Sequence, residues 1–225
     1  SCGISEAKRI WDSAGMTAES LCVACLFEDE ALLREQLDLS DMFGARTLVI
    51  ITGGFEALKS AGHDCDIDYA RSLLVERLAL AAELADSYRV RLAFEPLHPM
   101  VCGFRSIVST LQESLDILDQ MDDSHDIGLA IDTYALWWEH DLREKLKRAG
   151  RRILNYHVSD WLADTRDLRL DRGMPGDGQI ALCDWRHMIE TAGYFGPIEV
   201  EIFSRDRWWK TPAEKMIEEI IQRMN

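Results

Sequence analysis

The sequence predicts an α/β fold in which helices cover a parallel sheet. Six short apolar runs of strand length recur along the 225 residues, at 20–27, 47–52, 91–96, 127–134, 153–158 and 198–203. Stretches with helical spacing lie between them, and four end at a glycine just before the next run: Gly15, Gly44, Gly150 and Gly193. Alternating helices and continuously apolar strands are typical of a doubly wound sheet or a (β/α)8 barrel.

Helical spacing and capping patterns predict several helices along the chain. A helix is expected over 4–14, ahead of the first strand, and leucines at helical spacing before residue 91 predict a long one. Thr110 with Glu113, and Thr211 with Glu214, have the form of capping boxes, so helices begin there. The second of these is expected to run to about Met224.

Two long polar loops, 53–66 and 159–180, each follow a strand. In a barrel this side is the carboxyl-terminal face, where active sites are assembled. Because six strands cannot close an eight-stranded barrel, we expect a single domain over 1–225 that is N-terminally incomplete. About 40 to 60 further residues, forming the first two strands and a helix, would close its open edges.

Composition excludes several classes of protein. Lysine and arginine number 25 against 40 aspartates and glutamates, a net charge of −15, so nucleic acid is not an expected partner. The chain has neither an apolar run of about 18 residues nor a signal-peptide pattern, so no membrane association and a cytoplasmic location are expected. Six cysteines are too few for a disulfide scaffold, and we expect reduced, mostly buried thiols at Cys2, Cys22, Cys25, Cys65, Cys102 and Cys183.

Four apolar strands are each followed by an ionisable residue: Glu95, Asp132, His157 and Glu201. Burying an unpaired carboxylate costs several kcal/mol, so a shared divalent cation best explains the set. Oxygen ligands with one imidazole suit Mn, Co, Mg or Zn, and the sequence does not choose among them.

Each of these residues also has a purely structural interpretation. A strand-end carboxylate commonly caps a helix or pairs with an arginine such as Arg89 or Arg91, and a lone histidine is more often a core residue. Four such coincidences on successive strands are improbable. On the last strand Glu199 competes with Glu201 because both face the same side, and Glu201 is favoured because it lies nearer the carboxyl end.

The ordered motifs resemble those of a known family. Glu-Pro-Leu, Asp-Thr-Tyr, His-Val-Ser-Asp, an Arg-Gly…Pro-Gly-Asp-Gly loop and Val-Glu-Ile-Phe follow successive strands. In this order they resemble the xylose isomerase-like TIM barrels, which include ketose 3-epimerases and inosose isomerases. The resemblance implies a (β/α)8 TIM barrel whose first two strands are missing from the chain. It also implies that Glu95, Asp132, His157 and Glu201 bind one divalent metal ion.

Substrate contacts follow the family only in part. Ketose 3-epimerases carry a histidine three residues after the aspartate, where this chain has Ala135. Either substrate recognition differs here, or a neighbouring group such as His98 or Trp137 substitutes. Arg172 matches the family's arginine near metal and substrate, and its alternative is a solvated loop residue. Five tryptophans are candidates either for sugar stacking or for packing and dimer contacts: Trp137, Trp138, Trp161, Trp208 and Trp209.

The expected function is a divalent-metal-dependent isomerase or epimerase acting on a ketose, inosose or related keto sugar. The metal would stabilise the cis-enediolate formed when Glu95 or Glu201 removes an α-proton, and the other glutamate would return a proton. The alternatives are a lyase that uses the same enolisation and a non-catalytic sugar-binding barrel. A nuclease with several strand-end histidines is disfavoured. The expected partner is a small-molecule sugar, with a homo-oligomer possible.

Overall fold

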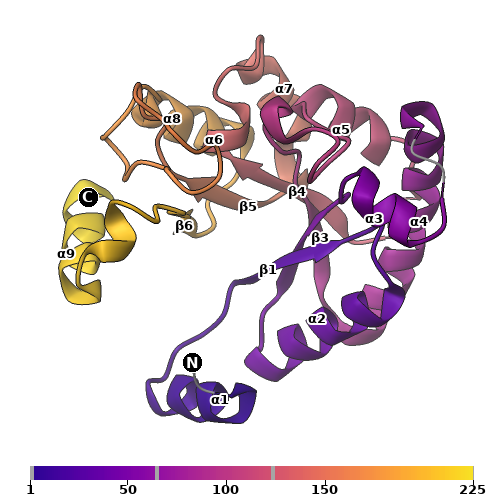
Figure 1. Ribbon diagram of the computed structural model, residues 1–225, viewed down its shortest axis with the longest axis horizontal. Helices are drawn as coiled ribbons and strands as arrows, with labels where there is room; N and C mark the ends of the chain where they lie inside the picture. Colours follow the sequence, from indigo (N-terminus) through magenta and orange to yellow (C-terminus); the bar gives the residue numbers. More distant parts are fainter. Residues whose placement is uncertain (1–2, 64–65, 123–124, 225) are drawn as a thin grey trace. The chain divides into compact units, whose positions relative to one another are not determined.

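A computed structural model describes residues 3–63, 66–122 and 125–224 of the chain. The chain forms two compact units. The first comprises Ser1–Phe94, Gly103–Ile107 and Asp116–Gly128, and the second comprises Glu95–Cys102, Val108–Leu115 and Leu129–Asn225. Each unit has strands and helices in alternation (Figure 1).

The strands of the first unit are β1 (Ser20–Cys25), β2 (Thr47–Ile51) and β3 (Arg91–Phe94). They are parallel, with Ser20 opposite Thr47 and Thr47 opposite Arg91. Every residue of β2 is buried, since this strand is paired on both sides. The continuous run of apolar residues in the sequence reflects this double burial.

Four helices accompany these strands: α1 (Ile4–Ser13), α2 (Glu30–Phe43), α3 (Phe55–Ser60) and α4 (Ile67–Tyr88). Asp29 begins α2 by accepting a 2.8 Å bond from the Ala31 N–H, and Gly44 ends it with φ of 72°. Leu37 of α2 and Leu74 of α4 are fully buried in the core. Buried apolar residues on one face therefore attach α2, α3 and α4 to the core, whereas α1 buries none of its residues.

The strands of the second unit are β4 (Ile127–Asp132, which enters this unit at Leu129), β5 (Ile153–Val158) and β6 (Ile198–Val200). They are also parallel, and Asp132 lies opposite His157, which in turn lies opposite Glu199. This register puts ionisable side chains at the same level of adjacent strands.

The helices of the second unit are α5 (Leu111–Leu118, of which the first turns belong here), α6 (Thr133–Leu136), α7 (Leu142–Ala149), α8 (Leu182–Ala192) and α9 (Ala213–Met224). Three 3-10 turns accompany them: η1 (Pro99–Val101), η2 (Gly150–Arg152) and η3 (Trp208–Lys210). The N–H of Glu113 donates to Thr110 Oγ1 at 3.1 Å, as the capping pattern predicts. Gly150 and Gly193 end α7 and α8 with positive φ.

All six predicted strands are present, and five of them end earlier than the apolar runs do. The largest difference is at β6, which ends at Val200 rather than at residue 203. Apolar residues just past a strand end, such as Leu26 and Phe27, are still buried, so apolar character alone does not mark where a strand ends. Among the described residues, no helix is both long and apolar enough to cross a bilayer.

Two expectations are corrected. The segment 53–66 is not simply a polar loop, because α3 lies within it and buries Leu58. The described cysteines are free thiols but not mostly buried, since Cys22, Cys102 and Cys183 are exposed and Cys25 is half-buried. Cys22 lies on β1, which among the described strands pairs with β2 alone, so apolar sequence context does not guarantee burial there. Cys2 and Cys65 lie outside the described residues.

Candidate metal and sugar site

Glu95, Asp132, His157 and Glu201 come together in the second unit. One carboxylate oxygen from each of Glu95, Asp132 and Glu201 lies within 4.8 Å of the other two. His157 Nδ1 lies 3.8 Å from Glu95 Oε1 and 3.9 Å from Glu201 Oε2. Asp132 and His157 are at most 1% exposed. The structure thus brings together the four residues that the strand ends predicted.

Strand geometry explains this convergence. Asp132 is the last residue of β4 and His157 the fifth of β5, and the two are register partners. Asp132 also caps α6, because its Oδ1 accepts the Tyr134 N–H at 2.9 Å. The capping interpretation of Asp132 is therefore correct for one oxygen, and it fixes the carboxylate so that Oδ2 faces the site.

Arg172 is the cationic partner of these carboxylates. Its Nη1 lies 2.9 Å from Asp132 Oδ2 and 2.9 Å from Glu201 Oε2. The guanidinium carbon also lies 4.4 Å from the centre of the Tyr134 ring. Arg172 is thus a bridging residue of the site and not a solvated loop residue.

Burial and neighbouring charges shift the pKa values of Glu201 and His157. Burial raises the pKa of Glu201 to about 7, although Arg172 acts to lower it. Burial lowers the pKa of His157, but the carboxylates of Glu95, Glu201 and Asp132 outweigh that effect and raise this pKa to about 9. Without a cation, the site therefore favours added positive charge on His157.

The donor set fits a divalent cation. Neither ring nitrogen of buried His157 has a hydrogen-bond partner among the described residues, although both are shielded from solvent. Three carboxylates and the Arg172 guanidinium leave two uncompensated negative charges when His157 is neutral. A divalent ion would compensate them and would give the imidazole a partner, and carboxylate oxygens with one imidazole suit Mn, Co, Mg or Zn.

Glu199 is engaged differently from Glu201. Its Oε1 accepts a 2.6 Å bond from Asn155 Nδ2, and its Oε2 lies 4.0 Å from His157 Nε2. Of the two glutamates, Glu201 is the one that joins Asp132 and Arg172.

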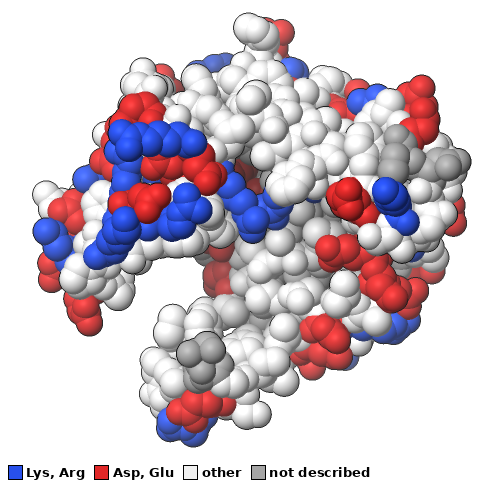
Figure 2. Space-filling view, viewed as in Figure 1, with Lys and Arg blue, Asp and Glu red and all other residues white. Residues whose placement is uncertain are grey.

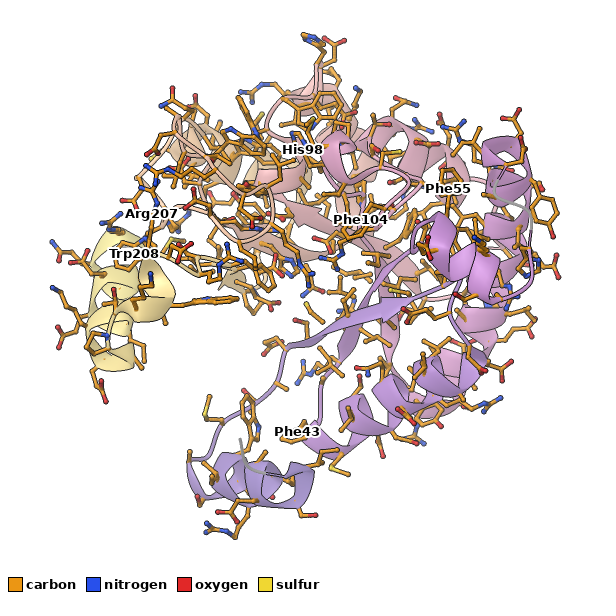
Figure 3. All side chains as sticks on the ribbon, viewed as in Figure 1. Phe43, Phe55, His98, Phe104, Arg207 and Trp208 are labelled. Carbon is orange, nitrogen blue, oxygen red and sulfur yellow. The ribbon has the colours of Figure 1, made fainter. Side chains whose placement is uncertain are left out.

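Aromatic rings from several segments form a cluster around Trp161 in the same unit. The rings of His98, Tyr134 and Trp137 have centroids 4.7, 4.7 and 5.5 Å from that of Trp161. His98, labelled in Figure 3, also packs edge-on against Trp138 at 5.9 Å, and Trp138 Nε1 donates to the Ala135 carbonyl at 2.8 Å. His98 therefore lies beside the segment in which this chain has alanine instead of histidine.

The other two tryptophans have separate roles. Trp208 Nε1 donates to Asp177 Oδ2 at 3.0 Å, and Trp209 Nε1 donates to the Ile202 carbonyl at 2.8 Å. These bonds hold the segment after β6, so the five tryptophans do not form one stacking surface.

Two residues near the site were missed in the sequence. Tyr134 lies against Arg172, and the fully buried Asp160 accepts several backbone hydrogen bonds beside it. The Asp-Thr-Tyr and His-Val-Ser-Asp motifs contain both residues, so their position two and three residues after a site residue was the available signal.

The fold and the site define an α/β barrel type in which ionisable side chains gather at strand ends. A family model for the xylose isomerase-like TIM barrel matches residues 28–225. The chain belongs to this family, and the predicted resemblance is confirmed. Its fold class is α/β, a partial TIM barrel with six parallel strands among the described residues.

Solved structures agree with this assignment. The protein SMc04130 from Sinorhizobium meliloti 1021 is 39% identical, with a TM-score of 0.87, over 98% of this chain and 82% of that one. The IOLI protein with a binding zinc atom is 18% identical, with a TM-score of 0.78, and the match covers 99% of this chain and 80% of that one. The 3-keto-D-glucoside 4-epimerase YcjR from E. coli is 16% identical, with a TM-score of 0.72, and the match covers 98% of this chain and 84% of that one. The last two show the fold alone. No curated protein sequence matches the chain.

Proposed function

We propose that this protein is a divalent-metal-dependent isomerase or epimerase that acts on a ketose, an inosose or a related keto sugar. The observation that carries the proposal is the convergence of three carboxylates on a buried histidine that has no hydrogen-bond partner among the described residues. Sugar isomerases and epimerases are found in the family to which the chain belongs, and the fold neighbour YcjR is a 3-keto-D-glucoside 4-epimerase.

Glu95, Asp132, His157 and Glu201 would hold the metal. A bound divalent cation supplies Lewis-acid stabilisation to negative charge that develops on substrate oxygens, such as the charge of an enediolate. Zinc is supported by the zinc atom in the IOLI protein, while the ligand types suit Mn, Co and Mg equally.

The two glutamates would exchange protons with the substrate. One carboxylate takes the proton from the carbon next to the carbonyl, and the electron pair of that C–H bond forms the enediolate. The other returns a proton to carbon. Return to the opposite face of the same carbon inverts it. Return to the former carbonyl carbon moves the carbonyl, provided that the hydroxyl proton of the first carbon passes to the former carbonyl oxygen.

Arg172, His98 and Trp137 would contact or orient the substrate. Arg172 would also orient the carboxylates of the site. Arg172 fixes Glu201 and Asp132 through its two 2.9 Å contacts. His98 Nδ1 accepts the Met100 N–H at 3.2 Å, so in the neutral ring Nε2 carries the proton and can donate to a sugar hydroxyl. Burial lowers the His98 pKa, which keeps this ring neutral.

The test is α-proton exchange. Protein loaded separately with Mn, Co, Mg or Zn is incubated in D2O with a panel of ketoses, inososes and 3-keto sugars, and NMR follows C–H loss. Exchange with product of unchanged composition supports the proposal. An unsaturated or diketo product would instead indicate a lyase, and metal binding without any exchange would indicate a sugar-binding barrel.

A further inference from the structure

The loop 159–180 contains neither a helix nor an extended strand, yet its backbone is closely held. Arg207, labelled in Figure 3, forms two ion pairs with this loop. Its Nε lies 2.9 Å from Asp171 Oδ1, and its Nη2 lies 3.0 Å from Asp164 Oδ2. Figure 2 shows this interleaving of Lys and Arg with Asp and Glu over the region. The inner side is organised by one buried carboxylate, that of Asp160.

Asp160 is fully buried, and its carboxylate accepts four backbone hydrogen bonds. Oδ1 accepts from Trp161 and Ile180, each at 2.9 Å. Oδ2 accepts from Gly176 at 3.0 Å and from Gly178 at 2.8 Å. One side chain at the end of β5 therefore closes a loop whose far end is 20 residues away in sequence.

The same residue determines the backbone next to Arg172. Asp160 and Gly173 exchange two N–H to C=O bonds, each of 2.9 Å. On its other side, the Arg172 N–H donates to the Phe203 carbonyl at 2.9 Å. Arg172 thus lies between the segments that follow β5 and β6, and the guanidinium reaches Asp132 and Glu201 from there.

The packing is too close for side chains at two of the loop glycines, Gly173 and Gly178. A Cβ at Gly178 would lie 2.2 Å from the Trp161 carbonyl oxygen and 2.6 Å from Asp160 Oδ1. A Cβ at Gly173 would lie 2.7 Å from a methyl of Leu162. Any group added at Gly178 must therefore displace the loop from Asp160.

We propose that Asp160 is a positioning residue for Arg172: its buried carboxylate gathers the loop 173–180, and this places the guanidinium between Asp132 and Glu201. The inference rests on the proposed function for its kinetic consequence only. Asparagine at position 160 has the same shape but one acceptor oxygen, and its NH2 group would face N–H donors. Asp160→Asn should therefore release the loop and misalign Arg172.

The direct readout is the NMR signal of the Arg172 guanidinium in 15N-labelled protein, with and without diamagnetic Zn²⁺. Arg172→Lys identifies the signal by its loss. Because Nη1 contacts two carboxylates, the signal should be resolved from those of solvated arginines in the wild type and lost in Asp160→Asn. A folded Asp160→Asn variant that keeps the signal would overturn the proposal.

The matched control is Asp167→Asn. Asp167 lies in the same loop and accepts the N–H groups of Arg169 and Leu170 at 2.9 and 3.0 Å, but no bond from 173–180. This variant should keep the Arg172 signal. If Asp160→Asn does not fold, Gly178→Ala should cause the same loss by moving the loop, and a retained signal there would equally contradict the proposal.

The kinetic readout separates positioning from general structural damage. Asp160→Asn should lower kcat roughly tenfold to a hundredfold, as a displacement of about 1 Å does. In an Arg172→Lys background it should have a further effect of less than about threefold, whereas full additivity would contradict the proposal. If the wild type exchanges no keto sugar, the proposed function fails, and the NMR result alone decides the role of Asp160.

Discussion

Asn155 of β5 donates a 2.6 Å hydrogen bond from Nδ2 to Oε1 of Glu199 on β6. Glu199 and Glu201 face the same side of their segment, so either was a candidate for the site. The bond from Asn155 holds Glu199 at the neighbouring strand, while Glu201 lies with Asp132 and Glu95. The two glutamates therefore give a test and its control within one segment.

Glu95→Gln and Glu201→Gln should each lower α-proton exchange by about 10²- to 10⁴-fold, because an amide has no basic carboxylate. Bound metal, measured by elemental analysis, should fall much less, since the amide oxygen remains a possible ligand. Glu199→Gln keeps an oxygen for Asn155 and should retain exchange. Undiminished exchange in a metal-loaded double variant would remove both glutamates from the catalytic role.

Divalent cations should stabilise the folded protein. At a free concentration of 100 times Kd, binding to the native state adds about 2.7 kcal/mol to the free energy of unfolding. Thermal unfolding with EDTA and with each metal measures this. His157→Ala should remove most of the increase, whereas exposed His187→Ala should keep it. Equal stabilisation of both variants would place the metal elsewhere.

Arg172→Gln should destabilise the metal-free protein by about 3–5 kcal/mol, because buried Asp132 and half-buried Glu201 would lose their cationic partner. Urea unfolding in EDTA provides the measurement. Arg186→Gln is the control, since Arg186 forms an exposed pair with Glu190 and its loss should leave the midpoint almost unchanged. Similar midpoints for the two variants would show that Arg172 does not compensate the buried carboxylates.

His98→Gln should raise KM for the keto sugar roughly tenfold with a smaller change in kcat, because a substrate-binding residue acts on ground state and transition state alike. Exposed His140→Gln should leave both constants unchanged. Steady-state kinetics with the substrate found by deuterium exchange decides this. A fall in kcat at constant KM would indicate a role in proton transfer instead.

Cys25 should react slowly with iodoacetamide at pH 8. Burial raises the pKa of its thiol to about 11, with Glu28 adding to the effect, so little thiolate is present below that pH. Cys102 and Cys183 are exposed and should be alkylated first. Peptide mass mapping distinguishes them, and in urea Cys25 should react as fast as the others.

The sequence alone determined the positions of the strands and the strand-end site residues. Apolar runs such as 47–52 are long enough to be buried on both faces, and parallel strands bring their carboxyl ends to one edge. Glu95, Asp132, His157 and Glu201 could therefore be grouped before any coordinates. The capping box at Thr110 could also be predicted from the sequence, because its partner Glu113 is only three residues away.

Only the tertiary structure decided how these residues are paired. The Arg172 to Asp132 contact spans 40 positions, and the Asn155 to Glu199 bond spans 44. Three of the four bonds to Asp160 likewise depend on where a long loop returns to its strand. Side-chain periodicity states which face a residue occupies, but the partner across that face is set by strand register and loop path, which form only when distant segments pack together.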